Sequence, residues 1–407
     1  MENFIKISDI IKSKNVLKIN FEVSQNLKNF FNEMTYYAEY NFDIESIPDS
    51  ILNISFLCNI LPIAWLNNST IIVETIDKDF YNSIKEFKKG YIDMYPMLKF
   101  NSPEIKYNSM EENKNKENDK KTTSGAFFSG GVDAFATLFA HIQEKPVLIT
   151  VWGADIAIKD QYGWKNMKNL VETASSKYNL SYQYIKSNFK EFLKTSELLP
   201  LIKSTGDGWW HGFQHGIGLI SLASPIAYEF GLENIYIASS YTKEDKATCA
   251  SDPTIDNYIK YANTKIFHDQ YEYSRQEKIE RIVKYANDTQ LFPTIHVCWE
   301  SDGGINCCKC EKCCRTMVEF MLANANPKEF GFEKYDAKRI ETRMKLFNDI
   351  NNINYRFWNE MKNKSIDMGE KCRFNEQLNW LRKSKFSPKK NYLKKICRKV
   401  SKICEKL

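Results

Sequence analysis

The stretch from Gly125 to Leu138 constrains the fold of this chain more than any other. It begins with small and aromatic residues typical of a short buried strand and ends in apolar residues that favour a packed helix. Between them lie Gly130, Gly131 and Asp133. Glycines let a backbone turn sharply and approach a ligand, and the first turn of a helix offers unpaired N–H groups and a partial positive charge. The stretch therefore predicts a strand–turn–helix unit that cradles an anion, usually phosphate; an ordinary turn before a helix is the alternative.

Downstream of this loop, predicted strands and helices alternate. The apolar run 146–152 is typical of a strand that is covered on both faces. Further strands are predicted at 181–185 and 234–238, and helices at 166–178, 209–230 and 273–286. This alternation indicates an α/β fold with a doubly wound parallel sheet, which binds its ligand at the carboxyl ends of the strands.

Polar residues that follow the predicted strands are candidates for the site. Asp155 could bind a ribose hydroxyl, a substrate amine or Mg²⁺, with capping of the next element as the alternative. His211 and His215 share one helix face at i and i+4, but Gly212 replaces the Glu of a zinc-protease H-E-x-x-H. We predict a substrate-pocket role for His211 and packing for His215. The polar segments 239–245 and 251–253 suit a substrate loop, or else a solvated one.

A cluster of cysteines gives the sharpest chemical signal in the chain. Four of them follow the spacing C-x8-C-x2-C-x2-C, at Cys298, Cys307, Cys310 and Cys313. Two-residue spacers let successive thiolates face one ion, and four thiolates satisfy tetrahedral Zn²⁺ without an open position. We therefore predict a structural zinc site and prefer it to an iron–sulfur cluster, which also accepts four thiolates. Cys308 and Cys314 are left over, either packed or exposed.

The sequence outside these motifs suggests the domain limits. Residues 1–107 read as an accessory α/β domain, with strands at 16–23 and 70–74 and a buried helix at 51–66 broken near Pro62. The polar segment 108–123 reads as a linker. It precedes a nucleotide domain at 124–330 and a helical region at 331–407, whose tail carries an amphipathic basic helix with apolar positions at Leu393, Ile396, Val400, Ile403 and Leu407.

Charge and composition narrow the class of protein. Residues 380–407 carry eleven Lys/Arg and one acidic residue, so the remainder of a chain with net charge +6 carries −4. A slightly acidic body is not typical of a non-specific nucleic-acid binder. No apolar run is long enough to span a bilayer, and the first residues lack the layout of a secretory signal. Eleven cysteines, several of them clustered, then favour metal binding over disulfides, and we expect a cytoplasmic protein.

The glycine-rich loop resembles the SGGxDS loop of the PP-loop ATP pyrophosphatases, a HUP-like group. It matches neither the P-loop ending in Gly-Lys-Ser/Thr nor G-x-G-x-x-G, and Ala134 replaces the usual last serine. Together with the downstream cysteine spacing, it makes residues 124–325 similar to the 7-cyano-7-deazaguanine synthases. Segments 237–241 and 274–278 also look like that family's strand-four segment and Ser-x-x-Glu-Lys helix start. The segment 242–256 departs from the family's Ala-Glu-Asp and Tyr-Pro-Asp-Cys-Arg region for the deazaguanine carboxylate, so the substrate is expected to differ.

The resemblance implies an enzyme that forms AMP and pyrophosphate from ATP and adenylates a substrate, expected to be a carboxylate, for amidation or ligation. It implies ATP, Mg²⁺ and Zn²⁺ as cofactors, and a loop that holds ATP through Ser129, Gly130, Gly131, Val132 and Asp133. Asp133, Asp155 and His211 are the catalytic candidates.

Two other functions stay open. One is adenylation of an RNA base, with the basic tail holding phosphates; RNA thiolation is disfavoured, because no obvious catalytic cysteine stands alone for a sulfur relay. A nucleotide-binding module without turnover is favoured only by Ala134. The expected partner is a small-molecule substrate, and a homodimer is left open.

Overall fold

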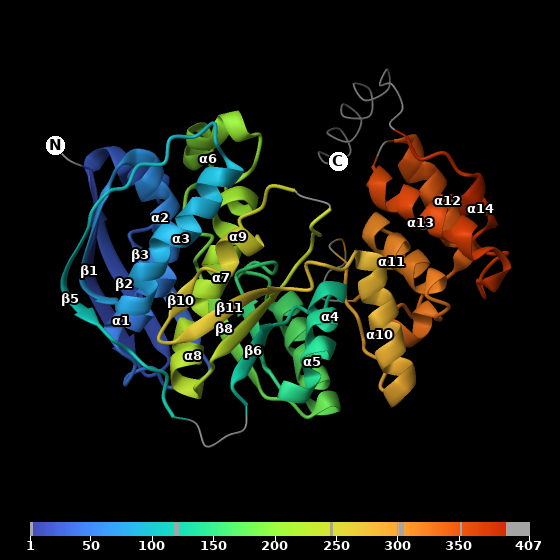
Figure 1. The fold of residues 1–407 in the computed structure, drawn as a ribbon, viewed down its shortest axis with the longest axis horizontal. Helices are drawn as coiled ribbons and strands as arrows, with labels where there is room; N and C mark the ends of the chain where they lie inside the picture. Colours follow the sequence, from blue (N-terminus) through green and yellow to red (C-terminus); the bar gives the residue numbers. More distant parts are fainter. Residues whose placement is uncertain are drawn as a thin grey trace. The chain divides into compact units, whose positions relative to one another are not determined.

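The computed structural model describes residues 3–117, 122–244, 247–298, 300, 305–350 and 352–387 (Figure 1). The chain forms two compact units, Met1–Arg275 and Gln276–Leu407. The glycine-rich loop belongs to the first unit and the four cysteines to the second. Among the described residues, none of the helices has both the length and the apolar character needed to cross a bilayer.

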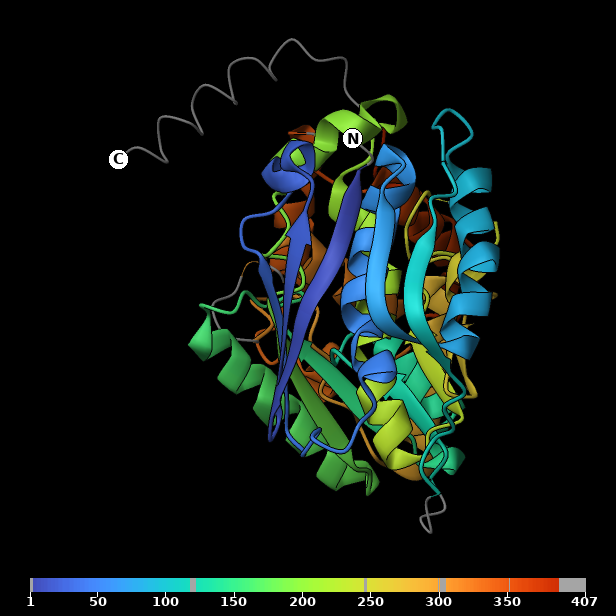
Figure 2. The ribbon, with the colours of Figure 1, turned by 90° about the vertical axis from the view of Figure 1, so that its left-hand side faces the viewer.

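The first unit is built on one sheet of eleven strands, in the order β10-β11-β9-β6-β7-β8-β3-β2-β1-β4-β5. Figure 2 shows the N-terminal strands of this sheet lying side by side. The strands are β1 Phe4–Ser13, β2 Val16–Val23, β3 Thr35–Tyr40, β4 Thr70–Asp77, β5 Ile105–Glu111, β6 Ser124–Phe127, β7 Val147–Trp152, β8 Tyr182–Ser187, β9 Asn234–Ala238, β10 Lys260–Tyr261 and β11 Thr264–Asp269.

Five neighbouring strands of this sheet, β11-β9-β6-β7-β8, pair in parallel. Numbered by their order in the chain and read from β8 to β11, the five strands follow the order 3-2-1-4-5, so the direction of the order reverses between β6 and β9. That reversal defines the switch point of a Rossmann-like sheet, where ligands bind beyond the carboxyl ends of the strands. The prediction of an α/β fold with a mostly parallel sheet is confirmed, although β3 and β10 flank the parallel strands in antiparallel orientation.

Helices cover the sheet of the first unit. They are α1 Asp49–Leu52, α2 Ile54–Asn67, α3 Lys78–Met94, α4 Val132–Ala140, α5 Gln161–Tyr178, α6 Thr195–Leu198, α7 His215–Leu222, α8 Ser224–Phe230 and α9 Pro253–Asp256. Helix α4 packs on β6 and β9, and α5 on β7 and β8, while α2 packs against α7 and α3 against α9. β7 is almost wholly buried, as its continuous apolar sequence predicts.

The N-terminal residues share their core with the rest of the first unit. The Phe56 ring lies 6.0 Å from the Phe192 ring, and Tyr91 stacks on Phe213 at the same centroid distance. β3 also pairs with β8, so strands from residues 4–111 and from residues 124–269 form one sheet. The limits proposed for an accessory domain at 1–107 and a nucleotide domain at 124–330 therefore differ from the observed units, because the sheet runs through both segments.

Local structure differs from three sequence-based expectations. β5 extends to Glu111, inside the expected linker 108–123, and the Asn115 side chain bonds to the Leu232 carbonyl at 2.7 Å. Pro62 lies inside α2 without ending it, because tertiary burial of the helix outweighs the lost hydrogen bond. The expected helix 209–230 is instead a π-helical turn, α7 and α8, and Pro225 at the start of α8 cannot continue the preceding helix.

The second unit is helical. Its helices are α10 Arg275–Thr289, which begins at the last residue of the first unit, α11 Glu311–Leu322, α12 Ala337–Asp349, α13 Tyr355–Met368 and α14 Asn379–Lys383. The fully buried Trp358 of α13 donates its indole N–H to Glu311 Oε1 at 2.9 Å. Helices thus occupy much of the described part of the region 331–407, but the amphipathic basic tail at 388–407 lies outside the described residues.

Candidate functional site

The glycine-rich loop joins β6 to α4, as predicted, and it is fixed from the neighbouring strand β7. The Phe128 N–H donates to the Ile149 carbonyl at 2.8 Å, and Thr150 Oγ1 donates to the Phe128 carbonyl at 2.7 Å. Gly130 has φ +70°, and a Cβ there would collide with the Leu170 side chain. Glycine is therefore required at this position both by backbone conformation and by packing.

The same loop opens toward the first turn of α4. Gly131 is the N-cap and has φ −78° and ψ 173°, a conformation open to any residue. As a glycine it supplies no capping side chain to the first turn of α4. Val132 is buried and Ser129 is exposed. At the switch point between β6 and β9, this arrangement suits an anion held by backbone N–H groups.

Asp133 in the first turn of α4 is paired with a residue that the sequence analysis did not single out. Arg275 Nη1 lies 3.4 Å from Asp133 Oδ2, and their side chains are 10% and 23% exposed. The guanidinium adds its positive charge to the partial positive charge of the N-terminus of α4. Arg275 falls in the segment 274–278 that resembles a family helix start, but its pairing across more than 140 residues left no trace in local sequence.

The ends of β7 and β8 place a cation beside Asp155. Gly153 follows β7 with φ +109°, and Asp155 is exposed two residues later. Lys190, beyond β8, donates to the Ala154 carbonyl at 2.7 Å and lies 4.1 Å from the Trp210 ring centroid. Burial lowers the pKa of Lys190, and the charge of Asp155 opposes that shift. Lys190 was not predicted, since a single lysine after a strand has no distinctive sequence pattern.

His211 projects from the π-helical turn Trp210–Gln214, a rare conformation that recurs at functional sites. Its Nδ1 lies 3.6 Å from Asp207 Oδ1, and its Nε2 lies 3.5 Å from the Tyr241 hydroxyl, which follows β9. The His211 side chain is 42% exposed. Its neighbour Asp207 is held in place because the Thr248 hydroxyl donates a hydrogen bond to Asp207 Oδ2 at 2.6 Å. His211 is thus accessible and oriented, as a substrate-pocket residue should be; that role stays a prediction.

His215 is under the electrostatic influence of several charged residues. Its Nδ1 is buried and has no hydrogen-bond partner among the described residues. Burial is the main cause that lowers the pKa of His215 to about 4, and the charge of Asp155 opposes it. Three other groups act in the same direction as burial: His211, Lys190 and His268. The ends of β7, β8 and β11 and the start of α7 therefore bring these side chains into one electrostatic neighbourhood, although we expected His215 only to pack.

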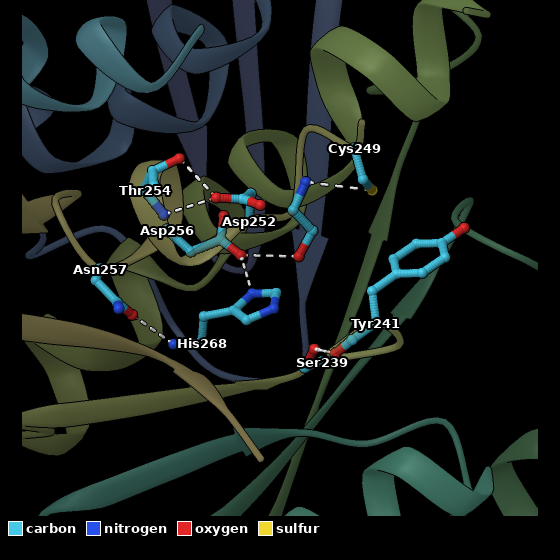
Figure 3. A network of polar contacts seen from close by, with 9 residues as sticks. Ser239, Tyr241, Cys249, Asp252, Thr254, Asp256, Asn257 and His268 are labelled. Atoms are coloured by element: carbon cyan, nitrogen blue, oxygen red, sulfur yellow. Dashed lines mark hydrogen bonds and ion pairs between the residues drawn. The ribbon is translucent and has the colours of Figure 1, made fainter. Parts of the chain in front are cut away.

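A buried histidine–carboxylate pair lies at the end of β11 (Figure 3). His268 Nδ1 is 2.8 Å from Asp256 Oδ2, and Ser251 Oγ donates to the same oxygen at 2.8 Å. Burial raises the pKa of Asp256, and the hydrogen bond from His268 opposes that shift. Neither residue was a candidate in the sequence analysis, which singled out only the nearby polar segment 251–253. No short motif joins residues 256 and 268.

On the α4 side of the sheet, a second histidine is held between two carboxylates. His141 Nε2 lies 3.0 Å from Asp269 Oδ1, and its Nδ1 lies 2.7 Å from Glu144 Oε1. Burial pushes the pKa of His141 down, but its hydrogen bonds with Asp269 and Glu144 outweigh burial and raise it. The ring also stacks on Tyr236 at 3.6 Å between centroids. These contacts tie α4 to β9 and β11.

The four predicted metal ligands do converge in the second unit. The Sγ atoms of Cys298, Cys307, Cys310 and Cys313 all lie within 4.8 Å of one another. Two of the separations are 3.8 Å and 3.9 Å. A tetrahedron with Zn–S bonds of about 2.3 Å has edges of about 3.8 Å. The cluster could therefore hold a metal ion such as zinc.

Backbone N–H groups support the cysteine cluster. Cys307 Sγ accepts from the N–H groups of Lys309 and Cys310, and Cys310 Sγ accepts from the N–H of Cys313. The side-chain hydrogen bond from Cys313 is the largest cause that lowers the pKa of Cys310 to about 6. Cys308, with φ +55°, makes the turn between the ligands. It is buried, as is Cys314, so the two remaining cysteines of the motif are packed rather than exposed.

The fold and the site together define an α/β protein with a Rossmann-like sheet and a four-cysteine cluster suited to a metal ion. No known protein family's sequence model matches this chain. Comparison with curated proteins gives no match either.

Proposed function

We propose that this chain is a PP-loop, HUP-like enzyme that splits ATP into AMP and pyrophosphate while adenylating a carboxylate substrate. The observation that carries the proposal is the position of the Ser-Gly-Gly-Val-Asp loop. It joins the central strand β6 to α4 at the point where the order of the parallel strands reverses. At such points phosphate groups are bound by the N–H groups of a helix N-terminus and by a glycine-rich backbone that approaches them closely. The cysteine cluster further along the chain agrees with the synthase-like resemblance.

In this proposal, the N–H groups from Gly130 to Asp133 bind the phosphates of ATP. The guanidinium of Arg275 adds positive charge beside Asp133. A carboxylate oxygen of the substrate attacks the α-phosphorus, the bond to the β-phosphate breaks, and pyrophosphate leaves. A nitrogen or sulfur nucleophile then displaces AMP. The chain supplies position and charge neutralisation rather than covalent chemistry.

Two carboxylates follow neighbouring strands of the sheet, Asp133 after β6 and Asp155 after β7, and Mg²⁺ prefers oxygen ligands and substrate phosphates. Asp133 and Asp155 would hold it, and it would neutralise charge on the phosphates. The four cysteines leave a bound zinc no open position, so they would stabilise the fold of the second unit.

Pyrophosphate release from ATP with Mg²⁺ tests this function. Carboxylic acids are added one at a time, and the deazaguanine carboxylate serves as the reference because the substrate is expected to differ from it. Gly131→Val is the informative variant, because Gly131 adopts a backbone conformation that valine tolerates. The added side chain would crowd the phosphate position while the backbone angles stay in an allowed region. We expect release to fall to background while zinc content and melting temperature are retained.

The matched control is Gly131→Ala, which adds only a methyl group. It should weaken ATP binding less than valine does. A folded, zinc-loaded Gly131→Val protein with unchanged ATP affinity would show that the loop is only a turn, and the proposal would fall.

One observation favours a second candidate, a nucleotide-binding module without turnover. Ala134, at the place of the usual serine, is buried in α4 and offers no hydroxyl to a phosphate. This candidate predicts ATP binding that Gly131→Val abolishes, together with no pyrophosphate release for any acid added.

A further inference from the structure

The last two residues of β11 face opposite sides of the sheet. Asp269 bonds to His141, at the end of α4, whereas His268 bonds to Asp256 in α9. Successive strand residues alternate in this way. The carboxyl end of β11 therefore presents one imidazole on the side of α7 and α9, where His211 and His215 also lie.

The imidazole of His268 is held rigidly. Besides the bond to Asp256 Oδ2, its backbone N–H donates to Asn257 Oδ1 at 2.7 Å. The side chains of His268 and Asp256 are 3% and 0% exposed. A Cβ at Gly216 would lie 2.5 Å from Asp256 Oδ1, so the first turn of α7 packs directly on the carboxylate. The ring cannot rotate without breaking a buried hydrogen bond.

This arrangement fixes which ring nitrogen is basic. With Asp256 ionised, its Oδ2 can only accept a hydrogen bond, so Nδ1 carries the ring proton and Nε2 keeps its lone pair. Nε2 has no partner within the described ranges, and it is not among their fully buried polar atoms. Figure 3 shows this nitrogen turned away from Asp256. A carboxylate on Nδ1 with Nε2 left open is the arrangement of a histidine base.

The position of His268 suits a reaction at the glycine-rich loop. β11 pairs with β9, and β9 pairs with β6, so His268 stands two strands from the loop at the same edge. Adjacent strands are about 4.8 Å apart, which gives about 10 Å across the sheet. An adenylated substrate bound at the loop could span that separation.

We propose that His268 accepts a proton in the second step of the reaction, and that Asp256 is its positioning residue. The inference rests on the proposed function. In that step the lone pair of an amine attacks the acyl carbon of the acyl adenylate. The C–N bond forms, the C–O bond to AMP breaks and AMP leaves with the electron pair, while a proton of the amine passes to Nε2. Asp256 stabilises the imidazolium that results.

Other titratable groups near His268 must be separated from it in any pH experiment. Asp256 and Asp252 belong to α9 and its N-cap, and the charge of Asp252 acts on Asp256. The Tyr271 ring lies 5.6 Å from the imidazole, and the charge of His268 acts on His215 at the start of α7.

The test separates the two half-reactions in the full-length, zinc-loaded protein. The deazaguanine carboxylate, or whichever acid releases pyrophosphate, is supplied with ATP, Mg²⁺ and ammonium chloride. Pyrophosphate and amide are measured in the first turnover. We expect His268→Gln to keep the pyrophosphate burst within about twofold and to slow amide formation by about 10²-fold at pH 7. The deficit should shrink at higher pH, where hydroxide can accept the proton in place of Nε2.

Two variants complete the design. His141→Gln, on the α4 side of the sheet, is the matched control and should form amide at the wild-type rate. Asp256→Asn should slow amide formation, and ¹⁵N NMR of the imidazole should show the proton moved from Nδ1 to Nε2. A merely structural role for Asp256 predicts no change of tautomer.

The outcomes distinguish this inference from the proposed function. If the wild type gives no pyrophosphate burst with any acid, the proposed function fails and takes the inference with it. A burst with equal amide formation in wild type and His268→Gln overturns only the inference. If His268→Gln does not fold, the test uses the wild type. The pH dependence of its amide rate must then match the protonation of the His268 ring measured by NMR, and a mismatch overturns the role of His268.

Discussion

The two candidate sites of this protein are built in opposite ways. The cysteine cluster takes all four ligands from one segment, residues 298–313. The edge of the sheet gathers its polar groups from the ends of β6, β7, β8, β9 and β11 and from the turn before α7. In the first site neighbours in sequence are neighbours in space, whereas in the second Asp133 meets Arg275 only through the folded sheet.

This difference shows what each site depends on. The turn between the cysteines is set by its own N–H···S bonds and by the left-handed residue Cys308. It needs the rest of the second unit mainly as an anchor for α11. The edge of the sheet depends on the register of parallel strands, since one residue of slippage would move His268 to the side that Asp269 occupies. Damage to the first site should therefore stay local, and damage to the sheet should spread.

The largest expected effect tests the local site. Cys310→Ser removes one of four thiolates, and structural zinc contributes about 10–16 kcal/mol of apparent binding free energy that is linked to folding. We expect zinc content to fall from one ion per chain toward none, with a large loss of thermal stability confined to the second unit. Elemental analysis and calorimetry measure both quantities.

Cys314→Ala is the control for that experiment, since Cys314 is fully buried yet lies outside the four ligands. It should keep its zinc. A zinc-free wild-type protein, or a fully stable Cys310→Ser, would contradict the assignment of the cluster.

A smaller but wider effect is expected at the glycine-rich loop. Gly130→Ala places a Cβ at φ +70° and against Leu170, so it should destabilise the first unit by about 1–3 kcal/mol. Gly131→Ala should change the free energy of unfolding little, because its backbone lies in the extended region. Urea unfolding of the two variants measures the difference. Equal stabilities would mean that the loop is not held in the conformation described.

A pH-dependent effect is expected on the α4 side of the sheet. The carboxylates around His141 raise its pKa in the folded state. The contribution of protonated His141 to the free energy of unfolding is therefore fully present below the pKa of the unfolded chain's histidine, about 6.5. It is lost as pH rises through the higher pKa of the folded state. His141→Gln should remove this part of the pH dependence of unfolding. Denaturant midpoints from pH 5 to 9 measure it, and identical slopes in both proteins would exclude the contribution.

The smallest effect is expected at the C-terminus. A chain that ends at Ser387 keeps α14 and the buried Leu381 and Phe386, so the second unit should stay folded. It should bind ATP about as well as the full chain, because residues 388–407 contain no phosphate-binding motif. Titration calorimetry gives the two affinities. A tenfold loss in the folded, shortened chain would assign the tail a part in nucleotide binding.

Much of the fold was accessible from sequence, but not the pairing of its parts. The alternation of residues 16–23 and the apolar run 146–152 predicted β2 and β7, since strand patterns depend on a few neighbouring residues. The antiparallel pairing of β3 with β8 was not predicted. It joins segments more than 140 residues apart, and local composition suggested a domain boundary between them.

The sequence by itself determined the cysteine cluster and the strand–turn–helix unit of the glycine-rich loop. Short spacers limit where Cys307, Cys310 and Cys313 can point, and the change from strand-forming to helix-forming residues across two glycines depends on adjacent residues alone. Tertiary structure alone decided that His268 meets Asp256. That pairing depends on strand register, helix packing and burial across the whole first unit. These are contacts between residues far apart in the chain, so the spacing of residues within a short segment does not predict them.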